Sequence, residues 1–225
     1  MNAFVKKFKL FTMVTIFGYI CKKNTIMKKI GILLFVSMAI ISTSCSSTEE
    51  TEETVEVTPV TYQLDTENSK LSWKGDEGPE HFHTGDLKFS EGTLTMKGED
   101  VESGEFIVDM KSISVTDQTP QEKVGYLVGH LQNEDFFNVE KFPTVKVVLG
   151  EYNDGKLKTT IHVLGQEITN DLPVRIKADG ETASIEGDFE VDFASTNMPG
   201  IQPDPESGEA ISSVFSFTLK AKLKK

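Results

Sequence analysis

The 225-residue chain has only two cysteines, Cys21 and Cys45, and both lie near its amino terminus. The rest of the chain therefore has neither a disulfide framework nor a thiolate metal site available to it. It also lacks a cysteine nucleophile, a Gly-x-Ser-x-Gly elbow and a recognisable Ser-His-Asp arrangement. We predict no enzymatic activity, because no activated nucleophile can be identified. The fold must be stabilised by packing alone.

Basic residues are scarce outside the amino-terminal region. The whole chain carries a formal net charge of −12, but residues 1–45 contain seven lysines and no acidic residue. Without residues 1–44, the chain has 16 basic and 35 acidic residues, a net charge of −19. Such a surface repels phosphate backbones and has no basic stripe to attract them. These charges exclude nucleic acid as an expected partner.

The amino-terminal region lacks an apolar run long enough to span a membrane. The run at residues 30–41 has twelve residues, whereas a spanning helix needs roughly twenty. Met27 and two lysines precede it, and small residues followed by Cys45 come after it. This pattern predicts a secretory signal peptide at residues 27–44. Because a cysteine directly after small residues resembles a bacterial lipobox, we expect Cys45 to be lipidated and to anchor the protein to a membrane.

The segments on either side of this signal also suggest functions. Residues 1–26 repeat a weaker basic and apolar pattern, so we interpret them as an over-extended amino terminus with the true start at Met27. The alternative is a start at Met1 with an anchor helix. Residues 45–61 hold the lipidated cysteine and a Ser-, Thr- and Glu-rich tether, which we expect to be disordered. The acidic run at residues 49–53 resembles export signals of surface lipoproteins or is a periplasmic spacer. We therefore predict a cell-envelope location, in the periplasm or on the outer-membrane surface.

Residues 62–225 alternate between apolar and polar side chains in a way that predicts one all-β domain. At residues 182–193 the odd positions are almost all apolar, and the even positions are mostly acidic or polar. This period of two indicates a strand with one face in a core and one in water. The same alternation occurs at residues 71–73, 87–89, 94–96, 106–110, 145–149, 157–163, 172–176 and 215–221.

These segments amount to about eight or nine strands, with turn signals at Glu91-Gly92, at residues 153–155 and at Asp179-Gly180. Short connections favour an antiparallel barrel, because closure removes exposed sheet edges. A barrel of eight strands is either filled by its own side chains or holds one slender ligand. A dry, packed sandwich remains the alternative.

One short helix is predicted before the Phe136-Phe137 pair. Thr119 and Glu122 have the spacing of a capping box, and Pro120 occupies the first helical position. The apolar residues then recur at helical spacing and predict a face turned toward the barrel. These residues are Val124, Leu127, Val128 and Leu131.

The segment that follows carries a family resemblance. Residues 129–144 read Gly-His-Leu-Gln-Asn-Glu-Asp-Phe-Phe-Asn-Val-Glu-Lys-Phe-Pro-Thr. This wording resembles the helix-to-strand signature of the YceI-like family, a His-Leu-x-x-x-Asp-Phe-Phe-(Asp/Asn) run followed by Tyr/Phe-Pro-Thr. Trp73, the His83-Thr84-Gly85 turn, residues 104–110 and residues 165–169 follow in the order that the resemblance leads us to expect. The family consists of lipocalin-like barrels that bind isoprenoid lipids.

The resemblance implies that the barrel binds, stores or transfers a long apolar lipid, an isoprenoid such as a quinone or polyprenol. It implies no other cofactor, and the sequence specifies no oligomeric state. The tail is expected among inward-facing side chains, with the polar end at a mouth near Trp73, His83 and Phe136-Phe137. The predicted ligand-binding residues are Trp73, Phe82, His83, Phe89, Phe106, Val108, Phe136, Phe137, Val147, Ile161, Phe189, Val191, Phe215 and Phe217.

Two other functions compete with this hypothesis. Any single inward aromatic residue is more typical of a solid core than of a ligand contact, and a solid core would make the protein a structural or adhesive surface lipoprotein. His81 and His83 are two residues apart and would share one strand face, a spacing that some metal sites use, with His130 and His162 as distant possible partners. The second competing function is therefore a periplasmic enzyme that uses His81 and His83. We predict no metal site, because such a pair is common by chance. Residues 197–210 are rich in proline and glycine and form either a lid or an irregular loop.

Overall fold

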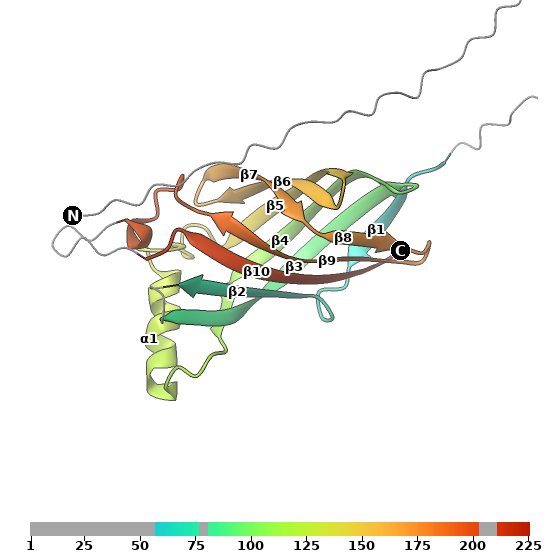
Figure 1. Cartoon of the computed structure of the whole chain (residues 1–225). Helices are drawn as coiled ribbons and strands as arrows, with labels where there is room; N and C mark the ends of the chain where they lie inside the picture. Colours follow the sequence, from blue (N-terminus) through green and yellow to red (C-terminus); the bar gives the residue numbers. More distant parts are fainter. Residues whose placement is uncertain (1–56, 77–80, 203–210) are drawn as a thin grey trace, which may run out of the picture. The chain divides into compact units, whose positions relative to one another are not determined.

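A computed structural model describes residues 57–76, 81–202 and 211–225. All of them belong to the second of two compact units of the chain, residues 53–225. Figure 1 shows an antiparallel barrel with one helix beside the end at which β2 ends and β3 begins. The elements are β1 (Val60–Leu64), β2 (Lys70–Asp76), β3 (Phe82–Lys97), β4 (Asp100–Val115), α1 (Gln121–Gln132), β5 (Thr144–Asn153), β6 (Lys156–Val163), β7 (Gln166–Pro173), β8 (Arg175–Ala178), β9 (Thr182–Asp192), the short 3₁₀ helix η1 (Pro199–Ile201) and β10 (Val214–Lys224).

The ten strands occupy eight positions around the barrel. β1 and β2 follow each other between β3 and β10 and pair with both of them. β7 and β8 are separated by Val174 alone; β7 pairs with β6, and β8 pairs with β9. These two strands therefore act as one bent strand that joins the two ends of the sheet. The prediction of an all-β antiparallel barrel of about eight strands is confirmed.

The bend at Val174 requires a close approach by β9. A Cβ atom at Gly187 would lie only 2.5 Å from the carbonyl oxygen of Pro173. Glycine has no Cβ, so β9 can approach the bent strand at this point. The seam of the barrel thus depends on one small residue.

The predicted alternation is confirmed in most of the predicted strands. In β9, for example, Ala183, Ile185 and Val191 are buried, whereas Glu186 and Asp188 are exposed. In β5, Val145, Lys146, Val147 and Val148 are all half-buried, and only Leu149 is buried. The inward faces of the strands meet in one hydrophobic core, to which Leu131 of α1 and the Phe136-Phe137 pair also contribute. Burial of this apolar surface is the main stabilising contribution in a domain without disulfides.

One predicted turn is wrong. Glu91 and Gly92 lie inside β3, which runs on as a single strand of 16 residues. The pairing with β4 shifts between Phe89 and Glu91, and this bulge brings Gly92 onto the inward face. A Cβ atom there would lie 2.5 Å from Cδ1 of Phe106. Glycine is needed here for space within the barrel, and the chain does not reverse direction.

The other two turn signals are confirmed. Asp154 and Gly155 join β5 to β6 with φ angles of 50° and 73°. Gly180, with a φ angle of 90°, lies between β8 and β9. Asp-Gly is favoured where both central residues of a two-residue hairpin turn need positive φ. This preference explains why the turn between β5 and β6 could be predicted from the sequence.

The helix is confirmed, but its predicted cap is wrong. α1 ends at Gln132, before Phe136, and its N-cap is Pro120 with no side-chain hydrogen bond. The Thr119 hydroxyl donates to the carboxylate of Asp117 instead of capping the helix. Of the predicted apolar face, Leu131 is buried, and Leu127 and Val128 pack partly buried against the core.

Several predictions concern residues that the structure does not describe. They include the signal peptide, the lipidated Cys45 and most of the tether, and also residues 203–210. The barrel begins at Val60, two residues earlier than the predicted boundary at residue 62. The described part of the proline-rich segment packs against the core through Met198 and Ile201. No helical segment in the described part of the chain combines the length and apolar character that crossing a bilayer requires.

Candidate ligand-binding site

The barrel encloses a cavity of about 100 Å³. Its lining comes from β2 to β7, from β9 and β10, from Leu131 of α1 and from three residues outside these elements, Phe137, Val174 and Phe193. Among the described residues that line it, all but Thr159 are apolar, and none is charged. A cavity of this composition attracts hydrocarbon and offers no compensation to a buried charge.

The structure brings eleven of the fourteen predicted ligand-binding residues together around this cavity. They come from seven strands and from the segment after α1, because their side chains share the inward face of the barrel. These residues are Trp73, Phe89, Phe106, Val108, Phe137, Val147, Ile161, Phe189, Val191, Phe215 and Phe217.

The other three predicted residues lie outside the cavity. Phe82 is 50% exposed at the start of β3, and the Nζ atom of Lys74 lies 4.7 Å from the centre of its ring. His83 and Phe136 line a smaller hollow of about 30 Å³. Trp73, Leu131 and Phe215 line both this hollow and the main cavity. The structure therefore brings Trp73, His83 and Phe136 together at one end of the barrel.

Sequence reasoning missed fifteen cavity-lining residues. Most follow the inward alternation of the strands that were predicted, so the pattern contained the signal. Thr159 gave no such signal, because a polar side chain interrupts the apolar alternation of its strand. The missed residues are Leu71, Leu87, Met110, Ile113, Leu131, Val145, Leu149, Leu157, Thr159, Val163, Leu172, Val174, Ile185, Phe193 and Leu219.

Aromatic rings narrow the cavity by packing on one another. The ring centres of Phe193 and Phe215 are 5.4 Å apart, edge to face, and those of Phe137 and Phe193 are 6.0 Å apart. Phe189 and Phe217 stack with centres 5.9 Å apart. An apolar cavity of about 150 Å³ accommodates one benzene molecule. The cavity of this structure therefore has room for no more than a short piece of hydrocarbon, and a longer chain would require these rings to move.

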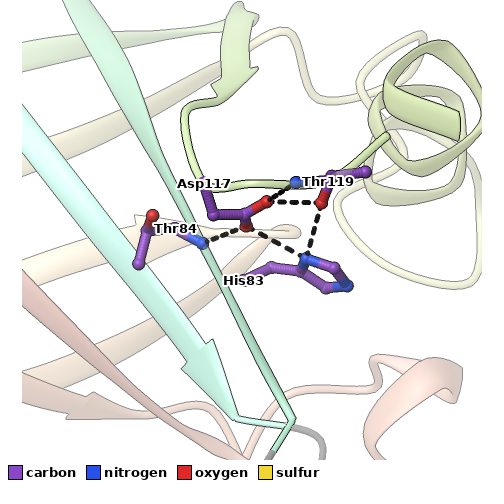
Figure 2. Close-up of polar contacts among 4 residues, drawn as sticks. All are labelled: His83, Thr84, Asp117 and Thr119. Carbon is purple, nitrogen blue, oxygen red and sulfur yellow. Dashed lines mark hydrogen bonds and ion pairs between the residues drawn. The ribbon is translucent and has the colours of Figure 1, made fainter. Parts of the chain in front are cut away.

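A polar cluster joins β3 to the segment that leads into α1 (Figure 2). The carboxylate of Asp117 accepts hydrogen bonds from the backbone N–H groups of Thr84 at 2.9 Å and Thr119 at 2.7 Å. It also accepts one from the Thr119 hydroxyl, and the Nδ1 atom of His83 lies 3.0 Å from Oδ2. His83 is thus held at the smaller hollow by a carboxylate that other donors orient.

The same contacts determine the ionisation of Asp117. Burial favours the neutral acid, but hydrogen bonds from the Thr119 hydroxyl, from the N–H groups of Thr84 and Thr119 and from His83 outweigh it. Together they lower the pKa of Asp117 from 3.8 to about 2. Asp117 is therefore a carboxylate at neutral pH, and it acts as a structural anchor.

The histidines are dispersed in the structure. His130 packs edge to face on Phe136, with ring centres 5.0 Å apart, and His162 lies 3.3 Å from Glu167. His81 is exposed just before β3, while His83 contacts Asp117. Within residues 57–76, 81–202 and 211–225, no group of three or more His, Cys, Asp or Glu side chains is arranged to hold a metal ion.

Two buried side-chain donors in the described part of the chain have no hydrogen-bond partner. They are Nε1 of Trp73 and Nδ2 of Asn170. Trp73 is 5% exposed and lines the cavity. Its indole lies against Gly85, where a Cβ atom would come within 2.6 Å of Nε1 and would collide with the carbonyl oxygen of Ser114. An unpaired buried donor costs free energy unless an acceptor reaches it.

Comparison with known proteins agrees with this architecture. The model of the YceI-like domain family matches residues 62–222. No curated protein matches the chain significantly.

Two solved structures share the fold. BcnA of Burkholderia cenocepacia is 15% identical, with a TM-score of 0.57 over 71% of this chain and 98% of that protein. A polyisoprenoid-binding domain from Saccharophagus degradans, implicated in plant cell wall breakdown, is 12% identical. Its TM-score is 0.54, over 72% of this chain and 97% of that domain. At these identities, the similarity is evidence of a common fold.

Proposed function

Because this chain belongs to the YceI-like domain family, we propose that its barrel binds a long apolar lipid for storage or transfer in the cell envelope. The observation that carries the proposal is the uncharged cavity, whose lining is apolar except for Thr159. Such a surface binds hydrocarbon by removing it from water. The proposed ligand class is an isoprenoid such as a quinone or polyprenol.

Two further considerations support an isoprenoid. The domain from Saccharophagus degradans, which has the same fold, is a polyisoprenoid-binding domain. Large ligands gain roughly −0.3 kcal/mol for each heavy atom, so a chain of about forty carbons can reach about −12 kcal/mol, near nanomolar affinity. Apolar contact alone therefore provides sufficient affinity, without covalent attachment.

Binding of a long chain requires the cavity inside the barrel to become larger. Phe189 and Phe217 line the cavity but are only half-buried, so their rings have room to turn outward. Rotation of these rings would enlarge the cavity. We propose that the ligand replaces ring-to-ring contacts with ring-to-ligand contacts of similar energy.

We propose that the polar end of the ligand lies at the mouth near Trp73, His83 and the Phe136-Phe137 pair. The unpaired N–H of Trp73 supports this orientation, because an acceptor oxygen on the ligand satisfies it. The adjoining hollow, which Trp73 shares with His83 and Phe136, provides space beside that group.

We also propose that Cys45 carries acyl chains that anchor the protein in the envelope. The support is the signal-like sequence before it, and two or more acyl chains make such an attachment durable. A Cys45→Ser variant should then move from the membrane fraction to the soluble fraction after cell lysis. Retention of this variant in the membrane would contradict lipid anchoring.

The close ring contacts favour a second candidate, a structural surface lipoprotein whose barrel stays filled. Extraction of protein purified from native membranes with organic solvent, followed by mass spectrometry, separates the two. A lipid carrier should release one isoprenoid in a fixed ratio to protein. Protein that folds normally and releases no stoichiometric lipid would favour the filled barrel.

A further inference from the structure

The cavity does not extend through the whole barrel. Its lining runs from Leu157 to Val163 in β6 and from Ile185 to Val191 in β9. At the end of the barrel opposite α1, buried apolar residues of β1, β3 and β10 belong to the core without lining the cavity (Figure 1). We call five of them the floor of the cavity: Tyr62, Leu64, Leu94, Ala221 and Leu223.

The boundary between the cavity and its floor is tightly packed. A Cβ atom at Gly92 would lie 2.5 Å from Cδ1 of Phe106, which lines the cavity, and 3.0 Å from Cδ2 of Leu64 in the floor. A Cβ atom at Gly104 would lie 2.7 Å from Cδ1 of Leu149, another lining residue. Even one further methyl group is too large for either position. A ligand tail therefore cannot pass this level without breaking the packing.

The two ends of the cavity differ in how their residues are held. Tyr62 pairs with Leu94 of β3, and Leu64 pairs with Leu223 of β10, so the strand that forms the middle of the floor has a partner on each side. At the other end, the cavity is covered by Leu131 and Phe137, from α1 and the segment after it. These segments can move without breaking hydrogen bonds of the sheet. The α1 end is therefore the end that can open.

The lined stretch limits the amount of tail that the barrel can enclose. A stretch from Leu157 to Val163 covers about 20 Å along its strand, or about 15 Å along the axis of a barrel whose strands tilt by about 40°. An extended covalent chain advances about 1.2 Å per bond, so about 15 to 20 Å accommodates about 12 to 16 bonds, or roughly three to four isoprene units. Movement of Phe189 and Phe217 widens the cavity but does not lengthen it.

We propose that the floor determines the length of isoprenoid tail that the barrel recognises, at about three to four isoprene units, and that Leu64 is a specificity-determining residue. The inference rests on the proposed function and narrows its ligand class. A tail of this length reaches from the floor to the mouth. A longer tail also binds, but its further units stay outside at the α1 end. They add no affinity, because they are not removed from water.

The test measures how affinity depends on tail length. Ubiquinones with one, two, four and six isoprene units compete with the fluorescent probe N-phenylnaphthylamine for purified, delipidated protein. The partition of each ubiquinone into the detergent is measured without protein, so that every affinity refers to free ligand in water. Leu64→Ala deepens the cavity. Met96→Ala is the matched control, because Met96 is buried at the same end of the barrel but borders an open hollow on its outside.

Wild-type affinity should rise about tenfold for each isoprene unit up to three or four, because each enclosed unit buries five carbons. It should change by less than about threefold between four and six units. Leu64→Ala should bind the six-unit ubiquinone about threefold to tenfold more tightly than the wild type, and the two-unit ubiquinone equally. Met96→Ala should leave both affinities unchanged. If Leu64→Ala does not fold, Leu64→Val and the wild-type series provide the comparison.

Two negative results remain distinguishable. The inference is overturned, while lipid binding stands, if wild-type affinity continues to rise about tenfold per unit from four to six units. It is also overturned if Leu64→Ala binds the six-unit ubiquinone no better than Met96→Ala does. If the wild type binds none of the ubiquinones, the proposed function itself fails, and the inference fails with it.

Discussion

The Nδ1 atom of His83 lies 3.0 Å from the Oδ2 atom of Asp117, and this contact links the start of β3 to the segment between β4 and α1. Asp117 also accepts hydrogen bonds from the backbone of Thr84 and Thr119 (Figure 2). One carboxylate thus joins the two segments at the mouth of the barrel. The geometry of the mouth depends on the charge of Asp117.

Substitution Asp117→Asn tests this dependence through pH. The pKa of Asp117 is lowered to about 2, so its ionised form stabilises the fold above about pH 4. That contribution is lost as the pH falls from about 4 to about 2, and it amounts to about 2 kcal/mol. Urea unfolding should show Asp117→Asn destabilised by about this amount at neutral pH, and the difference from the wild type should shrink toward zero as the pH falls through about 2.

The control for this experiment is Asp171→Asn, on the exposed outer face of β7. It should keep the wild-type dependence of stability on pH. A wild type whose stability does not change over this acid range, or an Asp117→Asn variant as stable as the wild type at neutral pH, would contradict the anchoring role.

Gly85→Ala should destabilise the protein by about 3 kcal/mol, the upper range for overpacking. The added methyl group would collide with the Ser114 carbonyl and would lie 2.6 Å from Nε1 of Trp73. Gly129→Ala is the matched change on α1, where a Cβ atom meets nothing within 4 Å. Because alanine favours helix over glycine, this control should gain up to about 1 kcal/mol. Chemical denaturation measures both; equal effects would refute the crowding argument.

Val147→Phe should fill the cavity and abolish lipid binding while the barrel remains folded. Val147 lines the cavity, and the larger ring would occupy its space. Val148→Phe is the matched control, because Val148 lies next in β5 on the opposite face. Lipid content after extraction and circular dichroism of both variants measure the outcome. Full lipid content in Val147→Phe would show that the ligand binds elsewhere.

Trp73 is the only tryptophan of the chain, so its fluorescence reports on the cavity directly. Because Trp73 is 5% exposed, its emission should be blue-shifted and resistant to the water-soluble quencher acrylamide. An isoprenoid quinone should quench it in a saturable manner. Acrylamide quenching as efficient as that of free tryptophan would contradict the burial of the indole, and unsaturable quinone quenching would contradict a binding site beside it.

Asn170→Leu should stabilise the ligand-free protein. The variant removes an unpaired buried amide, and the gain should be about 1 kcal/mol, or about 3 °C in the thermal midpoint. Thr159→Val should have a smaller effect, because the Thr159 hydroxyl has a partner at 3.3 Å. Thermal unfolding of delipidated protein provides the comparison. A lower midpoint for Asn170→Leu would show that the amide has a structural role.

Much of the barrel could be predicted from the sequence. Alternation assigned an inward face to residues 182–193 and to Val145, Val147 and Leu149, because side-chain direction in a strand follows from local geometry. The turns at Asp154-Gly155 and Gly180 could be predicted for the same reason, since positive φ is a local requirement. Eleven of the predicted residues line one cavity because they share the inward face of their strands.

Other features arise only when distant segments meet. Glu91-Gly92 continues β3 after a bulge between Phe89 and Glu91, and Gly92 leaves space there for the ring of Phe106 of β4. Thr119 leaves the helix cap because Asp117 competes for its hydroxyl. Phe82 faces solvent because it lies on the outward face of β3, where it pairs with Asp76 of β2. The cavity volume and the juxtaposition of Thr159 with Asn170 likewise depend on how all eight positions of the barrel close. Periodicity determines which face a residue occupies, whereas the space left between opposite faces depends on contacts between residues far apart in the chain.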